Sequence, residues 1–416
     1  MASSGQHYTQ AIKPSIMSFT RKAEPLYILG AGSMGLFLAA SLRIAYGSYP
    51  VKLLLRPHHH AKLDEDNHVT ICLRQEQPTA ERPNQIRRTA IGRLSPPRLV
   101  RVPAQIIHPE NVPQQQHQHH RRHIENVIVT TKADQAVSAI QSIEPLLTPW
   151  GEDSSQNLRI LLLCNGALAV REELFQACSE TLALQQQQSE HHRRILLGWT
   201  SQGAYREPPA KNDNEGDAKE DDNDDMFHVV QGGWGPSAVE EWPQLASVLQ
   251  DAGWPCQSLS SQQIQVDVWR KLAANCVINP LTALYQCTNG SLLLPAYHHE
   301  FQTTMKTVLA ELSKVAQAIL LTGENEELDS SVRTLLSEES LQDMVRQIVQ
   351  GTANNKSSML QDMLLIQQGR RRTTEIDYFN GFVVQQGHEH GLECPANEQL
   401  WNQVKELTYQ YRQGDA

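Results

Sequence analysis

The sequence has no long apolar run. No stretch approaches the ~20 apolar residues that a helix needs to span a bilayer, and no charged segment followed by an apolar core opens the chain. The first residues carry Lys13, Arg21 and Lys22 and no acid before Glu24, which faintly resembles a mitochondrial presequence but lacks an amphipathic helix. We expect a soluble cytoplasmic protein, with a mitochondrial location as the alternative, and interpret residues 1–24 as a disordered extension.

Cysteine is scarce and forms no motif. The seven cysteines are scattered without a C-x-x-C pair, a pattern typical of reduced thiols in a cytosol-like compartment. The histidine-rich run at residues 113–122 lacks cysteine or carboxylate partners at metal-binding spacing. We interpret this run as a solvated loop and predict no metal site.

Acidic residues are concentrated in one segment. The net charge is −10, but residues 212–225 hold eight acids against one lysine, a net of −7, which leaves about −3 for the rest. Such a run is a solvated, disordered insertion far more often than a binding surface. We expect a small-molecule substrate, with neither nucleic acid nor a membrane as partner, and leave a homodimer open.

A glycine-rich turn lies near the start of the chain. Residues 26–35, LYILGAGSMG, fit a short buried strand entering this turn, and residues 33–46 fit an apolar helix. Gly30 permits the tight turn, Gly32 lets a pyrophosphate approach the backbone, and Gly35 lets helix and strand pack closely. The helix N-terminus offers N–H groups to phosphate. We predict a dinucleotide-binding loop, with a tight turn without ligand as the alternative; the loop consists of Gly30, Ala31, Gly32, Ser33, Met34 and Gly35.

The next predicted strand, residues 51–55, ends without an acid. An NAD-binding chain has Asp or Glu there for the ribose 2′-hydroxyl, whereas this chain has Arg56 followed by Pro57 and three histidines. A guanidinium suits a 2′-phosphate. We therefore predict NADPH/NADP+ as the cofactor.

Two more buried strands, residues 126–131 and 158–164, end at Lys132 and Asn165. Ligands of open α/β sheets lie beyond such ends, which predicts cofactor or substrate contacts for both residues; ordinary loop residues are the alternative. Strand-like runs at 195–200 and 227–235 flank the acidic run, which we interpret as an expanded hairpin or loop.

The remainder of the chain has helical periodicity. It begins near Ser260 and covers residues 303–321, 340–351 and 358–386. The predicted fold class is α/β: a Rossmann-type dinucleotide-binding domain followed by an all-helical C-terminal domain. The first domain covers residues 25–258, with low-complexity insertions at about 108–123 and 207–226, and the substrate and catalytic domain covers 259–416.

One helical stripe is unusually polar. Within residues 269–290, WRKLAANCVINPLTALYQCTNG, Lys271, Asn275 and Asn279 recur at i, i+4 and i+8, and the apolar residues face elsewhere. A solvated helix face is the alternative. Asparagine is unfavourable inside a helix, however, so two of them one turn apart indicate a role beyond solubility. Pro280 should kink or break the helix and free a carbonyl for a ligand or water.

A second polar segment covers residues 355–381. Ser358 and Gln361 fit a capping box, so a helix cap is the alternative to a site role for Ser358. Glu375 precedes a core-facing stripe, and taken alone it fits a surface carboxylate.

Together these motifs resemble the ketopantoate reductases (2-dehydropantoate 2-reductases). The resemblance rests on GAGSMG, TTKADQ, CNGALAVREEL, the polar stripe segment, and SSMLQD followed by TEIDYFNG. It covers nearly the whole chain apart from the extension and insertions, and GRRRTTEID departs from the usual register before Glu375. It implies an active site in a cleft between the two domains. The implied catalytic residue is Lys271; the implied substrate contacts are Asn165, Asn275, Asn279, Asn289 and Ser358; the implied cofactor contacts are residues 30–35, Arg56, Lys132, Asn165, Ala204 and Glu375.

The activity that the resemblance implies is NADPH-dependent reduction of ketopantoate to pantoate, in pantothenate and coenzyme A biosynthesis. Hydride would reach the C2 ketone with Lys271 as general acid, and Glu375 would hold Lys271 or the cofactor in position. Reduction of another 2-oxo acid is one alternative, because a methyl group discriminates by only ~1–3 kcal/mol. A non-catalytic NADP-sensing protein is the other, and it would not need the Lys271 stripe.

Overall fold

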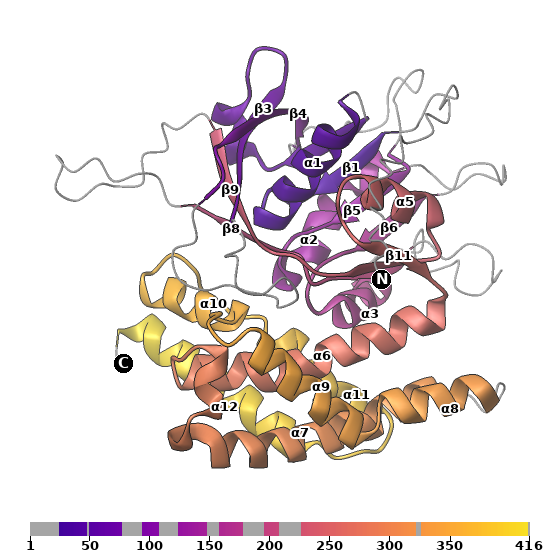
Figure 1. The fold of residues 1–416 in the computed structure, drawn as a ribbon, viewed down its shortest axis with the longest axis vertical. Coiled ribbons are helices and arrows are strands. Elements are labelled where there is room, and N and C mark those ends of the chain that lie inside the picture. Colours follow the sequence, from indigo (N-terminus) through magenta and orange to yellow (C-terminus); the bar gives the residue numbers. More distant parts are fainter. Residues whose placement is uncertain are drawn as a thin grey trace, which may run out of the picture.

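The computed structural model describes residues 25–47, 50–76, 94–107, 124–147, 158–177, 195–207, 226–321 and 326–414. A sheet with helices packed on it forms one half, and helices alone form the other (Figure 1). This arrangement confirms the predicted α/β fold class. The predicted extension, the insertion at residues 108–123 and nearly all of that at 207–226 lie outside the described residues.

A parallel sheet has the glycine-rich turn near its centre. Its strands are β1 (Leu26–Leu29), β2 (Val51–Leu55), β4 (Arg98–Ile106), β5 (Asn126–Val129), β6 (Arg159–Leu162) and β7 (Ile195–Thr200). They pair in the order β7-β6-β5-β1-β2-β4, so the chain leaves β1 towards one side and later returns to its other side. Ligands of open α/β sheets bind at such a reversal, beyond the carboxyl ends of the strands.

Further strands extend both edges of this sheet. Beyond β4 lie β3 (His68–Gln75), β9 (Met226–Gly233) and β8 (Gly203–Arg206), and beyond β7 lie β10 (Ser237–Glu240) and β11 (Cys256–Leu259). The sequence pattern did not predict β10, β11 or the intervening helix α5 (Pro243–Asp251). Four-residue strands are too short for alternation to be distinctive.

The predicted flanking strand at residues 195–200 is β7, which pairs with β6 and β10. The strand that directly precedes the acidic run is β8, and it forms an antiparallel pair with β9, with Arg206 opposite Val229. Because the ends of the two strands are adjacent, a short linker can join them, and loop-closure entropy changes slowly with length. We predict that replacing the acidic residues 212–225 by a short Gly/Ser linker leaves kcat and the thermal midpoint nearly unchanged. Loss of folding or of activity would show that this segment has a structural role.

Helices cover both faces of the sheet. The helices α1 (Ser33–Tyr46) and α5 pack on one face, and α2 (Ala133–Ile143) and α3 (Ala167–Ala177) pack on the other. The second face continues without interruption into the core of the helical half. Short 3₁₀ turns follow β2 and α2, at Pro57–Lys62 (η1) and Glu144–Leu146 (η3).

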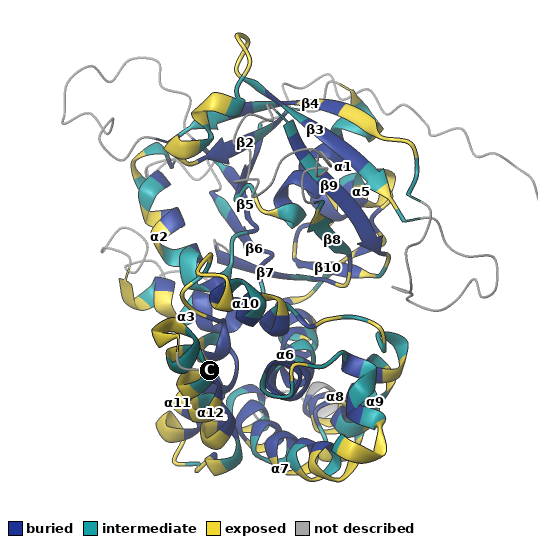
Figure 2. Ribbon diagram, turned by 90° about the vertical axis from the view of Figure 1, so that its left-hand side faces the viewer, coloured by how far each residue is buried: buried dark blue, intermediate teal, exposed yellow. Residues whose placement is uncertain are grey.

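The helical half is built around α6 (Ser261–Leu284), which contains the polar stripe and lies among the other helices (Figure 2). Sixteen of its 24 residues are buried, so it is a central helix rather than a surface helix. The other elements are η4 (Asn289–Leu293), α7 (Pro295–Leu320), α8 (Glu326–Leu335), α9 (Glu338–Gly351), α10 (Ser358–Gln367), η5 (Ile376–Tyr378), α11 (Asn380–Glu389) and α12 (Pro395–Gln413).

Pro280 does not break α6, contrary to the prediction. The helix continues to Leu284, and the carbonyl four residues before Pro280 belongs to Cys276. That oxygen accepts a hydrogen bond from Asn380 Nδ2 at 3.1 Å, so it is not left for a ligand. A neighbouring helix thus supplies the donor that proline lacks.

The periodicity of residues 358–386 predicted one helix, but the segment forms two, α10 and α11. Gly369 adopts the left-handed conformation (φ +69°), and the N–H groups of Gly369 and Arg370 bond to the carbonyls of Ile366 and Leu365. This is a Schellman-type helix end. The chain then forms a loop that brings Glu375 to the strand ends before α11 begins.

Candidate active site

The glycine-rich turn has the predicted backbone geometry. Gly30 has φ +123°, and a Cβ there would lie 2.9 Å from the Thr131 nitrogen. A Cβ at Gly35 would lie 2.0 Å from the Gly30 carbonyl oxygen, so close helix–strand packing requires glycine. At Gly32 the nearest atom would be 4.0 Å away, and this residue is the N-cap of α1 with no side-chain cap. The first N–H groups of α1 and the room at Gly32 therefore fit a dinucleotide phosphate.

Cationic side chains gather around Phe227 beside this turn. The guanidinium of Arg206 lies 5.1 Å and the ammonium of Lys62 lies 5.2 Å from the Phe227 ring centroid. The His59 ring contacts Phe227 edge-on at 5.5 Å. Burial, followed by repulsion from neighbouring cations including Arg56, lowers the pKa of His59 to about 4. The site is thus strongly electropositive.

Two arginines form hydrogen bonds in this region, one of them to the glycine-rich turn. Arg206 Nη2 donates to the carbonyl oxygen of Ala31 in the glycine-rich turn. Arg56 is exposed and donates to Gln135 Oε1 at 3.1 Å. Arg206 was not predicted, although it follows the predicted Ala204 by two residues on β8. That spacing places both side chains on the same side of the strand.

Lys271 lies on α6 below the end of β7. Its Nζ donates to the Thr200 carbonyl oxygen at 3.0 Å. Burial lowers the pKa of Lys271 to about 8, against opposing contributions from Cys164 and Glu375. Burial also raises the pKa of the Cys164 thiol to about 12, so this neighbour is uncharged. A lysine with this pKa keeps its proton at neutral pH and can readily release it.

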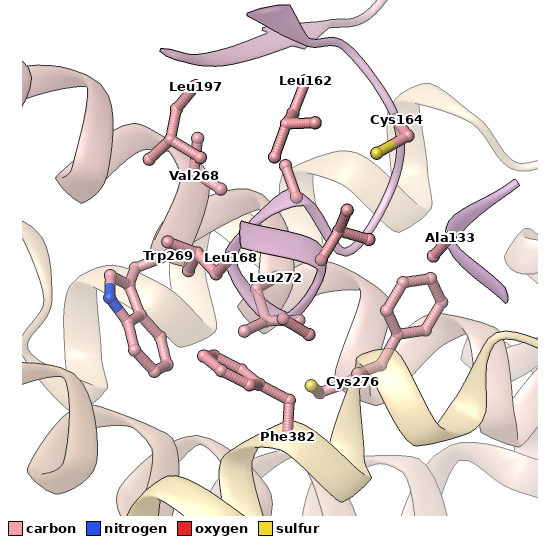
Figure 3. Packing of buried hydrophobic residues seen from close by; sticks show 14 of the residues in the cluster. Ala133, Leu162, Cys164, Leu168, Leu197, Val268, Trp269, Leu272, Cys276 and Phe382 are labelled. Carbon is pink, nitrogen blue, oxygen red and sulfur yellow. The ribbon is translucent and has the colours of Figure 1, made fainter. Parts of the chain in front are cut away.

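Lys271 shares a pocket with Asn275 and Asn165. The pocket has about 310 Å³ of empty volume and lies between the ends of β6 and β7 and the side of α6. Behind it, Leu168, Val268 and Leu272 belong to the apolar core that joins the two halves (Figure 3). This packing fixes the position of α6 relative to the strand ends.

Asn279 and Ser358 meet at the next turn of the stripe. Asn279 is buried, and its Nδ2 donates to Ser358 Oγ at 3.3 Å. The capping-box alternative for Ser358 is wrong, because the N-cap of α10 is Ser357, whose hydroxyl accepts from the Leu360 N–H. The Ser358 hydroxyl therefore faces the stripe.

Asn289 lies in a separate polar group at the start of η4. Its Nδ2 donates to Thr352 Oγ1 at 2.8 Å, and its backbone N–H donates to the Asn355 carbonyl. The side-chain oxygens of Asn289 and Asn355 are buried without a hydrogen-bond partner among the described residues. Unsatisfied buried acceptors of this kind suit a ligand that brings its own donor.

Glu375 and Lys132 connect the two halves. Glu375 is 1% exposed; its Oε2 accepts from Lys132 Nζ at 3.2 Å and its Oε1 accepts from the Ala133 N–H at 2.9 Å. The alternative interpretation of Glu375 as a surface carboxylate is therefore wrong. Its hydrogen bonds go to Lys132 and Ala133 rather than to Lys271. Lys132 Nζ also binds Asp362 Oδ2 at 3.2 Å. Burial alone would lower the pKa of Lys132, but these two carboxylates raise it overall.

Arg371 completes this interdomain ion cluster. It pairs with Asp134 on α2 at 3.1 Å and with Asp362 on α10 at 3.5 Å. Burial raises the pKa of Asp362 to about 6, although Lys132 and Arg371 oppose the change. Neither Asp362 nor Arg371 was predicted, because nothing in their local spacing shows that residues 230 positions apart will meet.

Three comparisons agree on one family. The family model described as Ketopantoate reductase PanE/ApbA matches residues 26–220, and its C-terminal counterpart matches residues 263–408. A 2-dehydropantoate 2-reductase of Vibrio cholerae is 33% identical over 292 residues, which cover 68% of this chain and 78% of that protein. The structure of a PanE/ApbA family ketopantoate reductase from Ralstonia eutropha has a TM-score of 0.60 at 21% identity, covering 93% of this chain and 99% of that one.

A solved structure with a different stated activity shares the fold. A D-mandelate dehydrogenase with NADH and anilino(oxo)acetate has a TM-score of 0.57 at 19% identity, covering 93% of this chain and 99% of that one. The described part of the present chain contains no helix long and apolar enough to cross a membrane.

Proposed function

The chain belongs to the ketopantoate reductase family, and from this premise we propose that it reduces ketopantoate to pantoate with NADPH, as a step towards pantothenate and coenzyme A. The observation that carries the proposal is the position of Lys271: a half-buried ammonium in a small pocket with Asn165 and Asn275, at the strand ends beside a dinucleotide-type turn. A protein that only sensed NADP would have no use for such an acid.

The proposed division of labour follows from the chemistry. A bound nicotinamide would supply the hydride that reduces the C2 ketone, and negative charge would then develop on the ketone oxygen. The Lys271 ammonium hydrogen-bonds that oxygen, stabilises the charge and transfers its proton to the oxygen. Its hydrogen bond to the Thr200 carbonyl, 3.0 Å long, aims Nζ at the pocket.

Uncharged polar groups of the pocket and of the elements beside it orient the substrate. The amides of Asn165, Asn275 and Asn279 and the hydroxyl of Ser358 can bind its carboxylate and hydroxyl without adding charge near Lys271. Asn289, with its unpartnered buried oxygen, would accept from a substrate hydroxyl. Lys132 and Glu375 lie at the carboxyl end of β5, where they would contact the cofactor.

The direct test is a steady-state assay of the full chain with NADPH and a panel of 2-oxo acids that includes ketopantoate. We expect ketopantoate to have the highest kcat/KM. If another 2-oxo acid is preferred, the protein is still a reductase but its substrate is that acid. If NADPH binds and no 2-oxo acid is turned over, the protein is an NADP sensor.

Cofactor preference gives a second test. The cations around Phe227 and the exposed Arg56 support a 2′-phosphate site, because charge-assisted hydrogen bonds to phosphate are strong. We predict that Arg56→Ala raises the KM for NADPH tenfold or more, about 1.4 kcal/mol, and leaves NADH kinetics nearly unchanged. Arg101→Ala is the matched control, since Arg101 is an exposed arginine paired with Asp64. An equal increase in KM for NADPH and NADH would show that Arg56 does not bind the 2′-phosphate.

A further inference from the structure

Trp199 is placed at the pocket by the register of β7. It is the last residue but one of that strand, and its side chain lies on the same face as Leu197, which belongs to the core shared with α6. Trp199 is half-buried, packs against that core and lines the pocket that contains Lys271. The adjacent residue, Thr200, provides the carbonyl that binds Lys271. Two adjacent residues of β7 therefore place both groups at the pocket: Trp199 contributes the indole, and the Thr200 carbonyl holds the Lys271 ammonium.

The indole is held in place by the polar stripe of α6. Trp199 Nε1 donates to Asp267 Oδ2 at 3.2 Å. Asp267 lies one helical turn before Lys271 and two turns before Asn275, so it extends the stripe. Burial raises the pKa of Asp267, and the indole N–H and Arg270 oppose this change. The hydrogen bond removes much of the freedom that an aromatic side chain at a strand end would otherwise have.

The pocket is lined by both polar and apolar side chains. Asn165, Lys271 and Asn275 are polar, while Trp199, Val268 and Leu168 are apolar. A 2-oxo acid would place its carboxylate and ketone against the polar side chains and its carbon chain against the indole.

We propose that Trp199, fixed by Asp267, is the residue that limits the size of the 2-oxo acid's carbon chain. This inference rests on the proposed reductase function. On this proposal the indole leaves room for a branched aliphatic chain and occupies the space that a phenyl ring would need. Trp199 acts on specificity through shape, and Asp267 is a positioning residue that acts through Trp199.

The experiment compares kcat/KM for ketopantoate and for phenylglyoxylate, an aryl 2-oxo acid, in the wild type and in Trp199→Ala. We expect the ratio of phenylglyoxylate to ketopantoate to rise at least tenfold in the variant, since filling or vacating a few carbon positions is worth ~10- to 200-fold. Asp267→Ala should shift the ratio in the same direction by a smaller factor. Asp267→Asn keeps an acceptor for the indole N–H, so the ratio in this variant should equal that of the wild type.

Two controls separate shape from general damage. Trp234→Ala removes an indole that is 40% exposed and does not line the pocket, and it should leave the ratio unchanged. Trp199→Phe keeps an aromatic wall and should stay within about threefold of the wild-type ratio. If Trp199→Ala binds NADPH normally but lowers both kcat/KM values equally, the proposal is overturned. A wild type that turns over neither acid would instead contradict the proposed function.

Discussion

Replacing Lys271 by alanine is expected to lower kcat by about 10²- to 10⁴-fold while NADPH affinity changes little. The reason is that the ammonium interacts more strongly with the oxyanion of the transition state than with the bound ketone. The Lys271 side chain donates to the Thr200 carbonyl and lines the pocket at the ends of β6 and β7, whereas the glycine-rich turn follows β1. Single-turnover kinetics and direct NADPH titration would measure the two effects separately.

The pH dependence of kcat tests the role of Lys271 independently. The pKa of Lys271 is lowered to about 8, mainly by burial. The general acid must carry its proton, so kcat for reduction should be level below pH 7 and fall about tenfold per pH unit above pH 8. In Lys271→Ala this alkaline decrease should disappear together with most of the activity.

Asn279→Ala is the matched comparison on the same stripe. Asn279 donates to Ser358 and carries no charge, so it binds ground state and transition state alike, and its loss should mainly raise the KM for ketopantoate. If Lys271→Ala folds, binds NADPH and keeps near wild-type kcat, the mechanism is wrong and the stripe is only a binding face.

Local sequence patterns predicted the structure correctly where residues close in the sequence determine it. The structural roles of Gly30 and Gly35 follow from two steric contacts within one turn, and the strand at Val51–Leu55 and the helix at Ser33–Tyr46 have the predicted bounds. The Lys271 stripe was also readable, because 3.6-residue periodicity places i, i+4 and i+8 on one side whether or not the helix is central. Its roles in binding and catalysis remain predictions.

Sequence rules failed where a distant segment supplied the partner. Pro280 was expected to interrupt α6, yet Asn380, 104 positions from Cys276, supplies the missing donor. Taken alone, Glu375 fitted a surface carboxylate, because its partner Lys132 is 243 residues away. Trp199 has no motif at all, and only the register of β7 against α6 shows that it lines the pocket. Such contacts depend on tertiary packing, which local propensity does not contain.

The second large effect concerns Glu375. Glu375→Ala is expected to lower the free energy of unfolding by about 2–4 kcal/mol. Breaking a buried ion pair commonly costs ~3–5 kcal/mol, and the value here should be smaller because the Lys132 side chain is 35% exposed and retains Asp362. The Ala133 N–H also loses its acceptor. Urea denaturation followed by fluorescence and circular dichroism would measure the change.

Glu375→Gln distinguishes the charge of Glu375 from its hydrogen bonding. The glutamine can still accept from the Ala133 N–H, so we expect less than half of the stability loss seen with alanine. Because the Glu375 carboxylate raises the pKa of Lys271 against the effect of burial, its removal should also move the alkaline decrease in kcat to lower pH. Glu173→Gln is the control, since Glu173 is exposed and bonds only the nearby Tyr378 hydroxyl among the described contacts. A wild-type pH profile in Glu375→Gln would mean that Glu375 joins the two halves of the molecule without influencing the proton donor.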